Sequence, residues 1–236
     1  MKNKFDEELE KLNISLSDEQ KKQFNMYYEL LVEWNKVMNL TGITDYDEVN
    51  LKHFTDSLAI NRVINADNVK NLIDVGTGAG FPGIPIKIVF PHIEVYLLDS
   101  LNKRVNFLNE VIEKLELKDI YAVHGRAEDF AKNVKFREKF DICVSRAVAN
   151  LSTLSEYCLP FVKTGGDFIS YKSGNSDEEI ADSEKAIGIL GGKIEKTDKF
   201  FLPGTDIGRT LVDIKKIKTT PKKYPRKAGV PAKEPL

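Results

Sequence analysis

The sequence predicts an α/β fold in which a helical N-terminal extension precedes a mostly parallel β-sheet that ends in an antiparallel hairpin. Three observations lead to this prediction. From residue 70 onward, short apolar runs alternate with helical periods, which is typical of βαβ units with strands buried on both faces. Residues 1–65 carry only helical patterns. The last two strand-like segments lie too close in sequence for a crossover helix to join them.

The helical extension is predicted over residues 1–65. Ser17, followed three residues later by Gln20, forms a capping box that indicates a helix start. After it, apolar side chains recur at three- and four-residue spacing, as on one face of an amphipathic helix: Phe24, Tyr27, Tyr28, Leu31 and Met38. A second stripe of this kind, Leu51, Phe54 and Leu58, predicts a later helix.

Residues 66–217 are expected to form the sheet domain. Strands are predicted at 71–75, 94–99, 120–124, 140–145 and 167–172, with helices between them at 84–90, 102–117, 150–161 and 177–190. Segments 193–201 and 209–217 are expected to pair as an antiparallel hairpin at the sheet edge, because only Pro203-Gly204 and a short loop separate them.

Composition excludes several classes of protein. A chain of 236 residues that is 42% hydrophobic and 30% charged is neither disordered nor a coiled coil. The longest apolar run, residues 84–90, contains Pro85 and Lys87, so we expect no membrane association. The acidic N-terminus lacks the apolar core of a signal peptide, and two cysteines without CxxC spacing indicate a reduced, cytoplasmic chain. Histidines and cysteines show no ligand spacing, so no metal site is predicted.

The C-terminal end is strongly basic. Residues 215–236 hold eight basic residues and one acid, a net charge of +7, which leaves −8 for residues 1–214 because the whole chain carries −1. We treat 218–236 as a basic tail that contacts nucleic acid, mainly through Lys222, Lys223, Arg226 and Lys227. The alternatives are a solubilising terminus and a tail that packs back on the acidic body. Its prolines, among them Pro221, Pro225 and Pro231, argue against a helix.

A glycine-rich loop follows the first predicted strand, with four glycines in the eight residues from Gly76 to Gly83. Glycines between a strand and a helix let a ligand approach the backbone closely. The loop matches G-x-G-x-x-G from Gly78, a weak signal by itself. A dinucleotide would bring a pyrophosphate near Asp74, which would repel it, whereas the cationic sulfonium of S-adenosylmethionine has the opposite preference. Alternatively, Asp74 stabilises the turn.

Further polar residues follow other strands and should meet at the same carboxyl edge of the sheet. Asp99 is placed to accept ribose hydroxyls, or else caps the next helix. The turn at 125–129 is a candidate for adenine recognition, or else a solvated turn. Arg146 and Lys172 end strands and predict contacts to a phosphate or carboxylate, with an ion pair as the alternative. We name no catalytic residue and keep these two as candidates for positioning.

Several separated segments together resemble one family. They are Asn39-Leu-Thr, His53-Phe and Asp56-Ser57 within residues 35–60; the DVGTGAGFPGIPI loop; the GRAED turn; VSRAVANL; and the ending KKYPRKAGVPAKEPL. Spread over nearly the whole chain, they resemble the bacterial 16S ribosomal RNA guanine-N7 methyltransferase G family, also called glucose-inhibited division protein B.

This resemblance implies a class I S-adenosylmethionine-dependent methyltransferase with a Rossmann-like, seven-stranded sheet. It implies methylation of N7 of one guanine in 16S rRNA, near the decoding region of the small ribosomal subunit. Cofactor contacts carried over from the family are Gly76, Phe81, Ala127, Glu128 and Arg146; the glycine loop and the strand end add Gly78 and Asp99. Guanine N7 carries no proton, so alignment and electrostatics suffice and no general base is required.

Two rival functions remain at this stage: a small-molecule methyltransferase, and a non-enzymatic ribosome-binding module that retains the cofactor fold. Label transfer from S-adenosylmethionine to an RNA or to a small acceptor distinguishes them. We expect a monomer. The sequence leaves open whether naked rRNA or the assembled subunit is the substrate.

Overall fold

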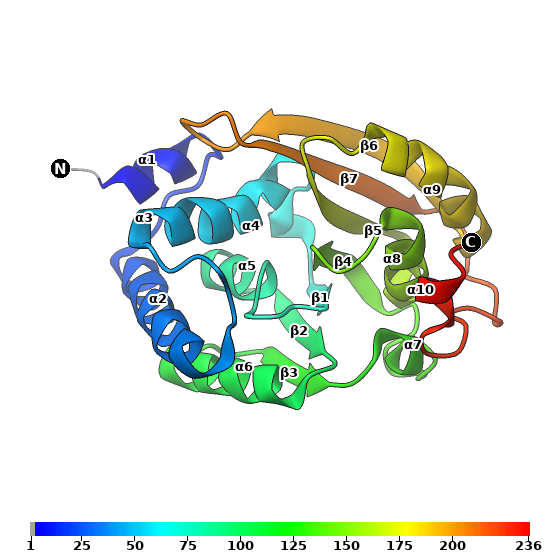
Figure 1. The fold of residues 1–236 in the computed structure, drawn as a ribbon, viewed down its shortest axis with the longest axis horizontal. Coiled ribbons are helices and arrows are strands. Elements are labelled where there is room, and N and C mark those ends of the chain that lie inside the picture. Colours follow the sequence, from blue (N-terminus) through cyan, green and yellow to red (C-terminus); the bar gives the residue numbers. More distant parts are fainter. Residues whose placement is uncertain (1–2) are drawn as a thin grey trace.

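The computed structural model describes residues 3–236 as a seven-stranded mixed sheet covered by helices on both faces (Figure 1). The strand order is β3-β2-β1-β4-β5-β7-β6; the first five strands are parallel, and β7 runs antiparallel to β5 and β6. The strands are β1 Asn71–Val75, β2 Glu94–Asp99, β3 Ile120–His124, β4 Phe140–Arg146, β5 Val162–Ser173, β6 Gly192–Phe201 and β7 Gly208–Lys216. All seven predicted strands and the C-terminal hairpin are confirmed.

Strand β5 is longer than predicted. It begins at Val162 instead of residue 167 and pairs there with Phe140, across an irregularity in the β4–β5 register. The added residues include Gly165 and Gly166, so this stretch has no apolar alternation by which the sequence would reveal a strand.

The helices between the strands lie where they were predicted: α5 Gly83–Val89, α6 Asn102–Lys114, α8 Leu151–Cys158 with η4 Leu159–Phe161, and α9 Asp177–Leu190. Two short helices were not predicted, α7 Ala127–Phe130 and α10 Val230–Lys233. Helix α10 corrects the expectation of a tail without helix. Its Pro231 lies in the first turn, where the missing N–H breaks no helical hydrogen bond.

The N-terminal extension is helical, as predicted; residues 1 and 2 lie outside the described residues. Its elements are α1 Lys4–Glu10, α2 Asp18–Met38, α3 Tyr46–Val49, the π-helical turn η1 Asn50–Thr55, α4 Asp56–Leu58, η2 Ala59–Arg62 and η3 Ala66–Asn68. The capping box at the start of α2 is present, with Ser17 and Gln20 bonded to each other's backbone. The stripe Leu51, Phe54 and Leu58 lies in η1 and α4, and all three side chains are buried.

The core has one layer on each face of the sheet, because successive strand residues point to opposite faces. Leu72 and Val144 face the N-terminal helices, α5 and α6, whereas Ile73 and Cys143 face α8 and α9. The N-terminal extension is therefore part of the main core. Across residues 3–236, none of the helices is both long and apolar enough to span a lipid bilayer.

Candidate functional site

The glycine loop is braced by a buried carboxylate. Oδ2 of Asp74 accepts hydrogen bonds from the Thr77 hydroxyl (2.7 Å) and from the Gly83 N–H (2.9 Å). Burial raises the pKa of Asp74 to about 7, and its Oδ1 has no hydrogen-bond partner among the described residues. These contacts match the turn-stabilising alternative for Asp74. Gly76 and Gly78 adopt φ of +74° and +63°, a region that favours glycine.

The first pocket at the carboxyl edge, here the glycine-loop pocket, has a volume of about 170 Å³. It is lined by Val75, Gly76, Leu98, Ser100, Gly125, Arg126, Ala127, Glu128, Val148 and Tyr157. It therefore brings together three predicted cofactor contacts, Gly76, Ala127 and Glu128. Val148 narrows this pocket, since a Cβ added to Gly76 would lie 2.5 Å from the Val148 side chain.

Asp99 lies behind the glycine loop, 2% exposed. Its Oδ2 accepts the Gly78 N–H (2.9 Å) and contacts Arg104 Nη1 (3.4 Å), and its Oδ1 accepts the Leu101 N–H (2.9 Å). A carboxylate has about four acceptor positions, so three are in use. Asp99 thus fixes the position of Gly78 directly and keeps about one unused acceptor position, but it does not line the glycine-loop pocket.

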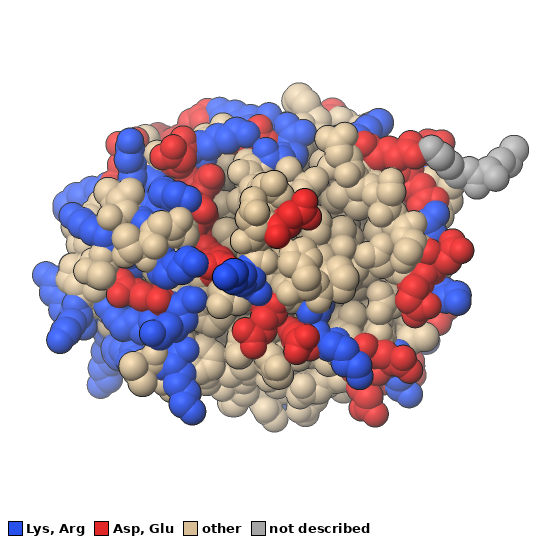
Figure 2. Space-filling view, turned by 180° about the vertical axis from the view of Figure 1, so that it is seen from behind, with Lys and Arg blue, Asp and Glu red and all other residues tan. Residues whose placement is uncertain are grey.

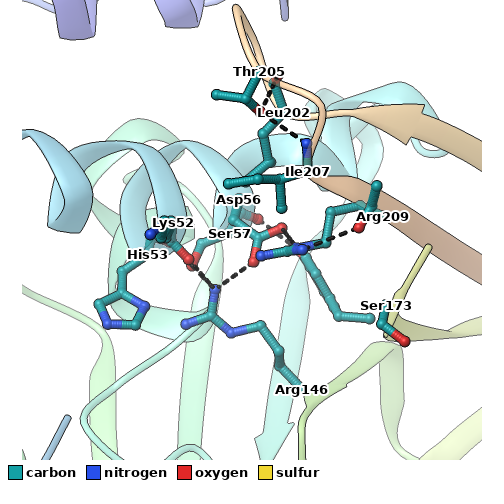
Figure 3. A network of polar contacts seen from close by, with 12 residues as sticks. Lys52, His53, Asp56, Ser57, Arg146, Ser173, Leu202, Thr205, Ile207 and Arg209 are labelled. Carbon is teal, nitrogen blue, oxygen red and sulfur yellow. Dashed lines mark hydrogen bonds and ion pairs between the residues drawn. The ribbon is translucent and has the colours of Figure 1, made fainter. Parts of the chain in front are cut away.

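The second pocket, here the Arg146 pocket, has a volume of about 550 Å³ and lies between the N-terminal extension and the ends of β4, β5 and β7. Its lining residues are Ile43, Lys52, His53, Asp56, Arg146, Ala147, Tyr171, Lys172, Ser173 and Arg209. Four of them are cationic and one is acidic. Figure 3 shows the acid, Asp56, between Arg146 and Arg209.

Phe81 and His53 form an aromatic layer beside Arg146. Phe81 is 6% exposed, stacks on His53 at 4.7 Å between ring centroids, and lies under the Arg146 guanidinium at 5.1 Å. The lining of the glycine-loop pocket does not include Phe81. The pKa of His53 is lowered to about 4 by burial, with Arg146 adding to the effect, so this ring is neutral at pH 7.

One short segment separates the two pockets. Arg146 and Ala147 line the Arg146 pocket, and Val148 lines the glycine-loop pocket. Ala147 adopts φ of +57°, and the next residues are held by Lys172, whose Nζ donates to Ala149 O (2.8 Å) and to Glu179 (2.6 Å). Lys172 thus fixes the C-terminal end of the segment 146–149 through the Ala149 carbonyl.

Known proteins similar to this chain decide its family. The family described as rRNA small subunit methyltransferase G matches residues 20–204. The chain is 56% identical over 232 residues to the ribosomal RNA small subunit methyltransferase G of Lachnoclostridium phytofermentans, covering 98% of this chain and 96% of that one. It is 59% identical over 223 residues to the Acetivibrio thermocellus protein of the same name, covering 94% and 91%.

The chain belongs to the rRNA small subunit methyltransferase G family. Its fold is that of class I methyltransferases. Among solved structures, TYW2 of Methanococcus jannaschii in complex with AdoMet aligns with a TM-score of 0.50 and 15% identity, over 62% of this chain and 69% of that one.

In this methyltransferase, the predicted RNA contacts of the tail divide into two kinds. Lys222, Lys223 and Lys227 are exposed. Arg226 instead forms a bidentate ion pair with Glu156, whose side chain is 1% exposed (2.7 Å, Nη2 to Oε2). Figure 2 shows Lys and Arg gathered on the side of the molecule where Figure 1 places the C-terminus.

The tail packs back on the body of the protein, which is one of the alternatives to a free RNA-binding tail that the sequence analysis gave. Ser152 Oγ donates to Leu236 O (3.1 Å), and Thr153 Oγ1 donates to Pro231 O (3.1 Å). The tail also reaches the glycine-loop pocket, since Gly229 N–H donates to Glu128 (3.0 Å). The tail and the glycine-loop pocket are therefore in direct contact in this methyltransferase.

Sequence reasoning assigned no function to several residues of the site. Asp56 and His53 were visible only as parts of the family pattern. The position of Arg209 in the site could not be predicted from the sequence. It depends on the register of the β5–β7 pair, which places Arg209 opposite Ser173. Within residues 3–236, no group of three or more His, Cys, Asp or Glu is arranged to hold a metal ion.

Proposed function

We propose that this methyltransferase transfers a methyl group from S-adenosylmethionine to N7 of one guanine in 16S rRNA, near the decoding region, in the cytoplasm. The observation that carries the proposal is the pair of pockets at the carboxyl edge of the sheet. A segment of three residues, 146–148, separates them. A donor bound in one pocket and an acceptor bound in the other would meet at this segment.

The residues of the glycine-loop pocket fit the cofactor. A Cβ added to Gly78 would meet no atom within 4 Å, so the space beside the loop is free. Ala127 and Glu128 would border the adenine, and Asp99, by holding Gly78, would shape the loop and offer one acceptor to the ribose. When bound, S-adenosylmethionine supplies a methyl group on a positively charged sulfonium. The pocket is smaller than the usual ~300–1,000 Å³ of ligand sites, so Val148 has to move aside.

The Arg146 pocket fits the acceptor nucleotide. Its cationic side chains suit RNA phosphate, and its volume of about 550 Å³ lies within the usual range of ligand sites. Guanine N7 attacks through its own lone pair, so the enzyme has only to orient it. The low pKa of His53, about 4, agrees with this, since it makes the ring a poor proton acceptor at pH 7, and the ring serves instead to support Phe81 beneath Arg146.

The exposed lysines of the tail are proposed to contact RNA phosphates outside the two pockets. Lys222, Lys223 and Lys227 carry charge that no carboxylate within the described residues neutralises by an ion pair. Such contacts position RNA without reading its sequence. We therefore assign recognition of the target guanine to the Arg146 pocket and general affinity to the tail.

The test is methyl transfer from radiolabelled S-adenosylmethionine to 16S rRNA taken from cells that lack the protein. Naked rRNA and small subunits are tested in parallel, and 7-methylguanosine is located by borohydride reduction and aniline cleavage of the RNA. We expect label at one guanine and none in rRNA from cells that contain the protein. Label in a small acceptor but not in RNA would support the small-molecule rival. RNA binding without transfer would support the non-enzymatic one.

A further inference from the structure

Asp56 joins three elements that are far apart in sequence. It is the first residue of α4 and is 4% exposed. Its Oδ2 contacts Arg146 Nη1 on β4 at 3.0 Å, and its Oδ1 contacts Arg209 Nε on β7 at 3.1 Å (Figure 3). One carboxylate of the N-terminal extension thus holds two guanidinium groups of the sheet.

The contacts of the two arginines leave part of each guanidinium for a ligand. Arg146 uses Nη1 for Asp56 and for the carbonyls of Lys52 and His53, at 3.4 Å each. Arg209 uses Nε for Asp56 and Nη1 for its neighbour's carbonyl. Among the described residues, Nε and Nη2 of Arg146 and Nη2 of Arg209 have no hydrogen-bond partner, and both side chains line the Arg146 pocket.

The charges in the pocket do not balance. Lys52 is paired with Glu48 (2.7 Å) and Lys172 with Glu179 (2.6 Å). Asp56 carries one negative charge against the two positive charges of its arginines, which leaves an excess of +1. These arginines are mostly buried, with side chains 14% and 23% exposed. Because unpaired charge is costly where solvation is reduced, this excess positive charge favours an anion in the pocket.

We propose that Asp56 is a positioning residue, which holds Arg146 and Arg209 so that their free N–H groups bind one phosphate of the acceptor RNA beside the target guanine. This inference rests on the proposed function for the identity of the acceptor. Asp56 itself touches neither substrate nor cofactor in this scheme. It acts through the direction in which the two guanidinium groups point, which bidentate recognition of a phosphate requires.

The test compares two carboxylates in full-length protein. Asp56→Asn keeps the shape of the side chain and removes its charge. Asp198→Asn is the matched control, because Asp198 also joins the N-terminal extension to the hairpin, through Arg62 (2.6 Å), away from the pocket. We measure kcat and KM with 16S rRNA, calorimetric binding of guanosine 5′-monophosphate, and the melting temperature that gives the folded fraction.

We expect Asp56→Asn to lower kcat at least tenfold and to change the KM for rRNA less than threefold, since other phosphate contacts dominate RNA affinity. Binding of guanosine 5′-monophosphate should weaken at least fivefold. Simple Coulomb attraction alone would instead strengthen monophosphate binding, because the substitution removes a negative charge near the anion. Asp198→Asn should change neither quantity by more than twofold. Unchanged kcat per folded molecule, or tighter monophosphate binding, would overturn the proposal.

Arg209→Gln keeps the test decisive if Asp56→Asn folds poorly, and the double variant measures the coupling of the two residues when Asp56→Asn folds. Arg209→Gln removes one of the two guanidinium groups and should also weaken monophosphate binding at least fivefold. If Asp56 acts through the arginines, the double variant should be within threefold of Asp56→Asn alone. Losses that multiply would overturn the proposal. Absence of rRNA methylation by the unaltered protein, with monophosphate binding still dependent on Asp56, would refute the proposed function and leave this inference standing.

Discussion

Replacing Arg226 by alanine tests whether a basic residue of the tail serves RNA or the fold. Arg226→Ala deletes three contacts to Glu156, at 2.7, 3.0 and 3.1 Å, and one to the Glu234 carbonyl at 2.8 Å. Among the described residues, Glu156 then keeps only the N–H of residue 226 as a hydrogen-bond partner. Removing one partner of a buried ion pair costs about 3–5 kcal/mol. Because that N–H remains, we expect the lower end, about 3 kcal/mol, or roughly 6–12 °C in melting temperature.

The contrasting variant neutralises the three exposed lysines, Lys222, Lys223 and Lys227, as alanines. Each phosphate contact contributes about 0.7–0.9 to the slope of log affinity against log salt, so the slope should flatten by roughly 2–3 units. The melting temperature should stay within about 2 °C, since exposed charges contribute little to stability. Calorimetry gives the melting temperatures, and RNA binding at several salt concentrations gives the slopes. Arg226→Ala melting like the unaltered protein while flattening the slope would refute this division of the tail.

Three further predictions concern the body. Asp99→Ala loses the acceptor of the Gly78 N–H, so S-adenosylmethionine affinity should fall by about tenfold to a few hundredfold; unchanged affinity in a folded variant, by calorimetry, would contradict it. Arg146→Ala should lose most methyl transfer yet melt higher than Arg226→Ala, because Asp56 keeps Arg209; the reverse order would make Arg146 mainly structural. Burial, followed by the charge of Asp167, raises the pKa of Asp213 to about 7, so the folded state is increasingly penalised as pH rises from about 4 to 7. Asp213→Asn should therefore gain stability relative to the unaltered protein across that window, by at most about 4 kcal/mol, and a difference independent of pH in urea unfolding would refute the assignment.

The central strands of the sheet could be predicted from sequence because they are buried on both faces and bounded by turn residues. In β1 and β4 nearly every residue is buried, so each run is apolar enough to stand out from the helices around it. The short helix α7, Ala127–Phe130, was not predicted because four residues cannot display a helical period. Sequence periodicity thus predicts elements long enough to bury a whole face, and it does not predict helices of a single turn.

The site was predictable where chain order alone brings residues together. Gly76, Ala127 and Glu128 follow parallel strands, whose carboxyl ends share one edge, so their meeting in one pocket follows from the topology. Partners across the two layers were not predictable in this way. Asp56 meets Arg146 and Arg209 across 90 and 153 residues of chain, and this depends on how the N-terminal extension packs on the sheet.

The charge that residues 215–236 can offer to RNA is smaller than their formal charge of +7, because internal ion pairs neutralise part of it. Lys215 pairs with Asp167, the buried Lys216 lies 3.3 Å from Glu138, and Arg226 pairs with Glu156. The exposed cations that remain in the segment are Lys218, Lys222, Lys223, Lys227 and Lys233. Five phosphate contacts set a ceiling of about 3.5–4.5 on the contribution of this segment to the salt slope. A larger contribution would require Glu156 or Glu138 to release its partner when RNA binds. Binding would then be coupled to partial unfolding of the tail, and through Gly229 and Glu128 to the glycine-loop pocket.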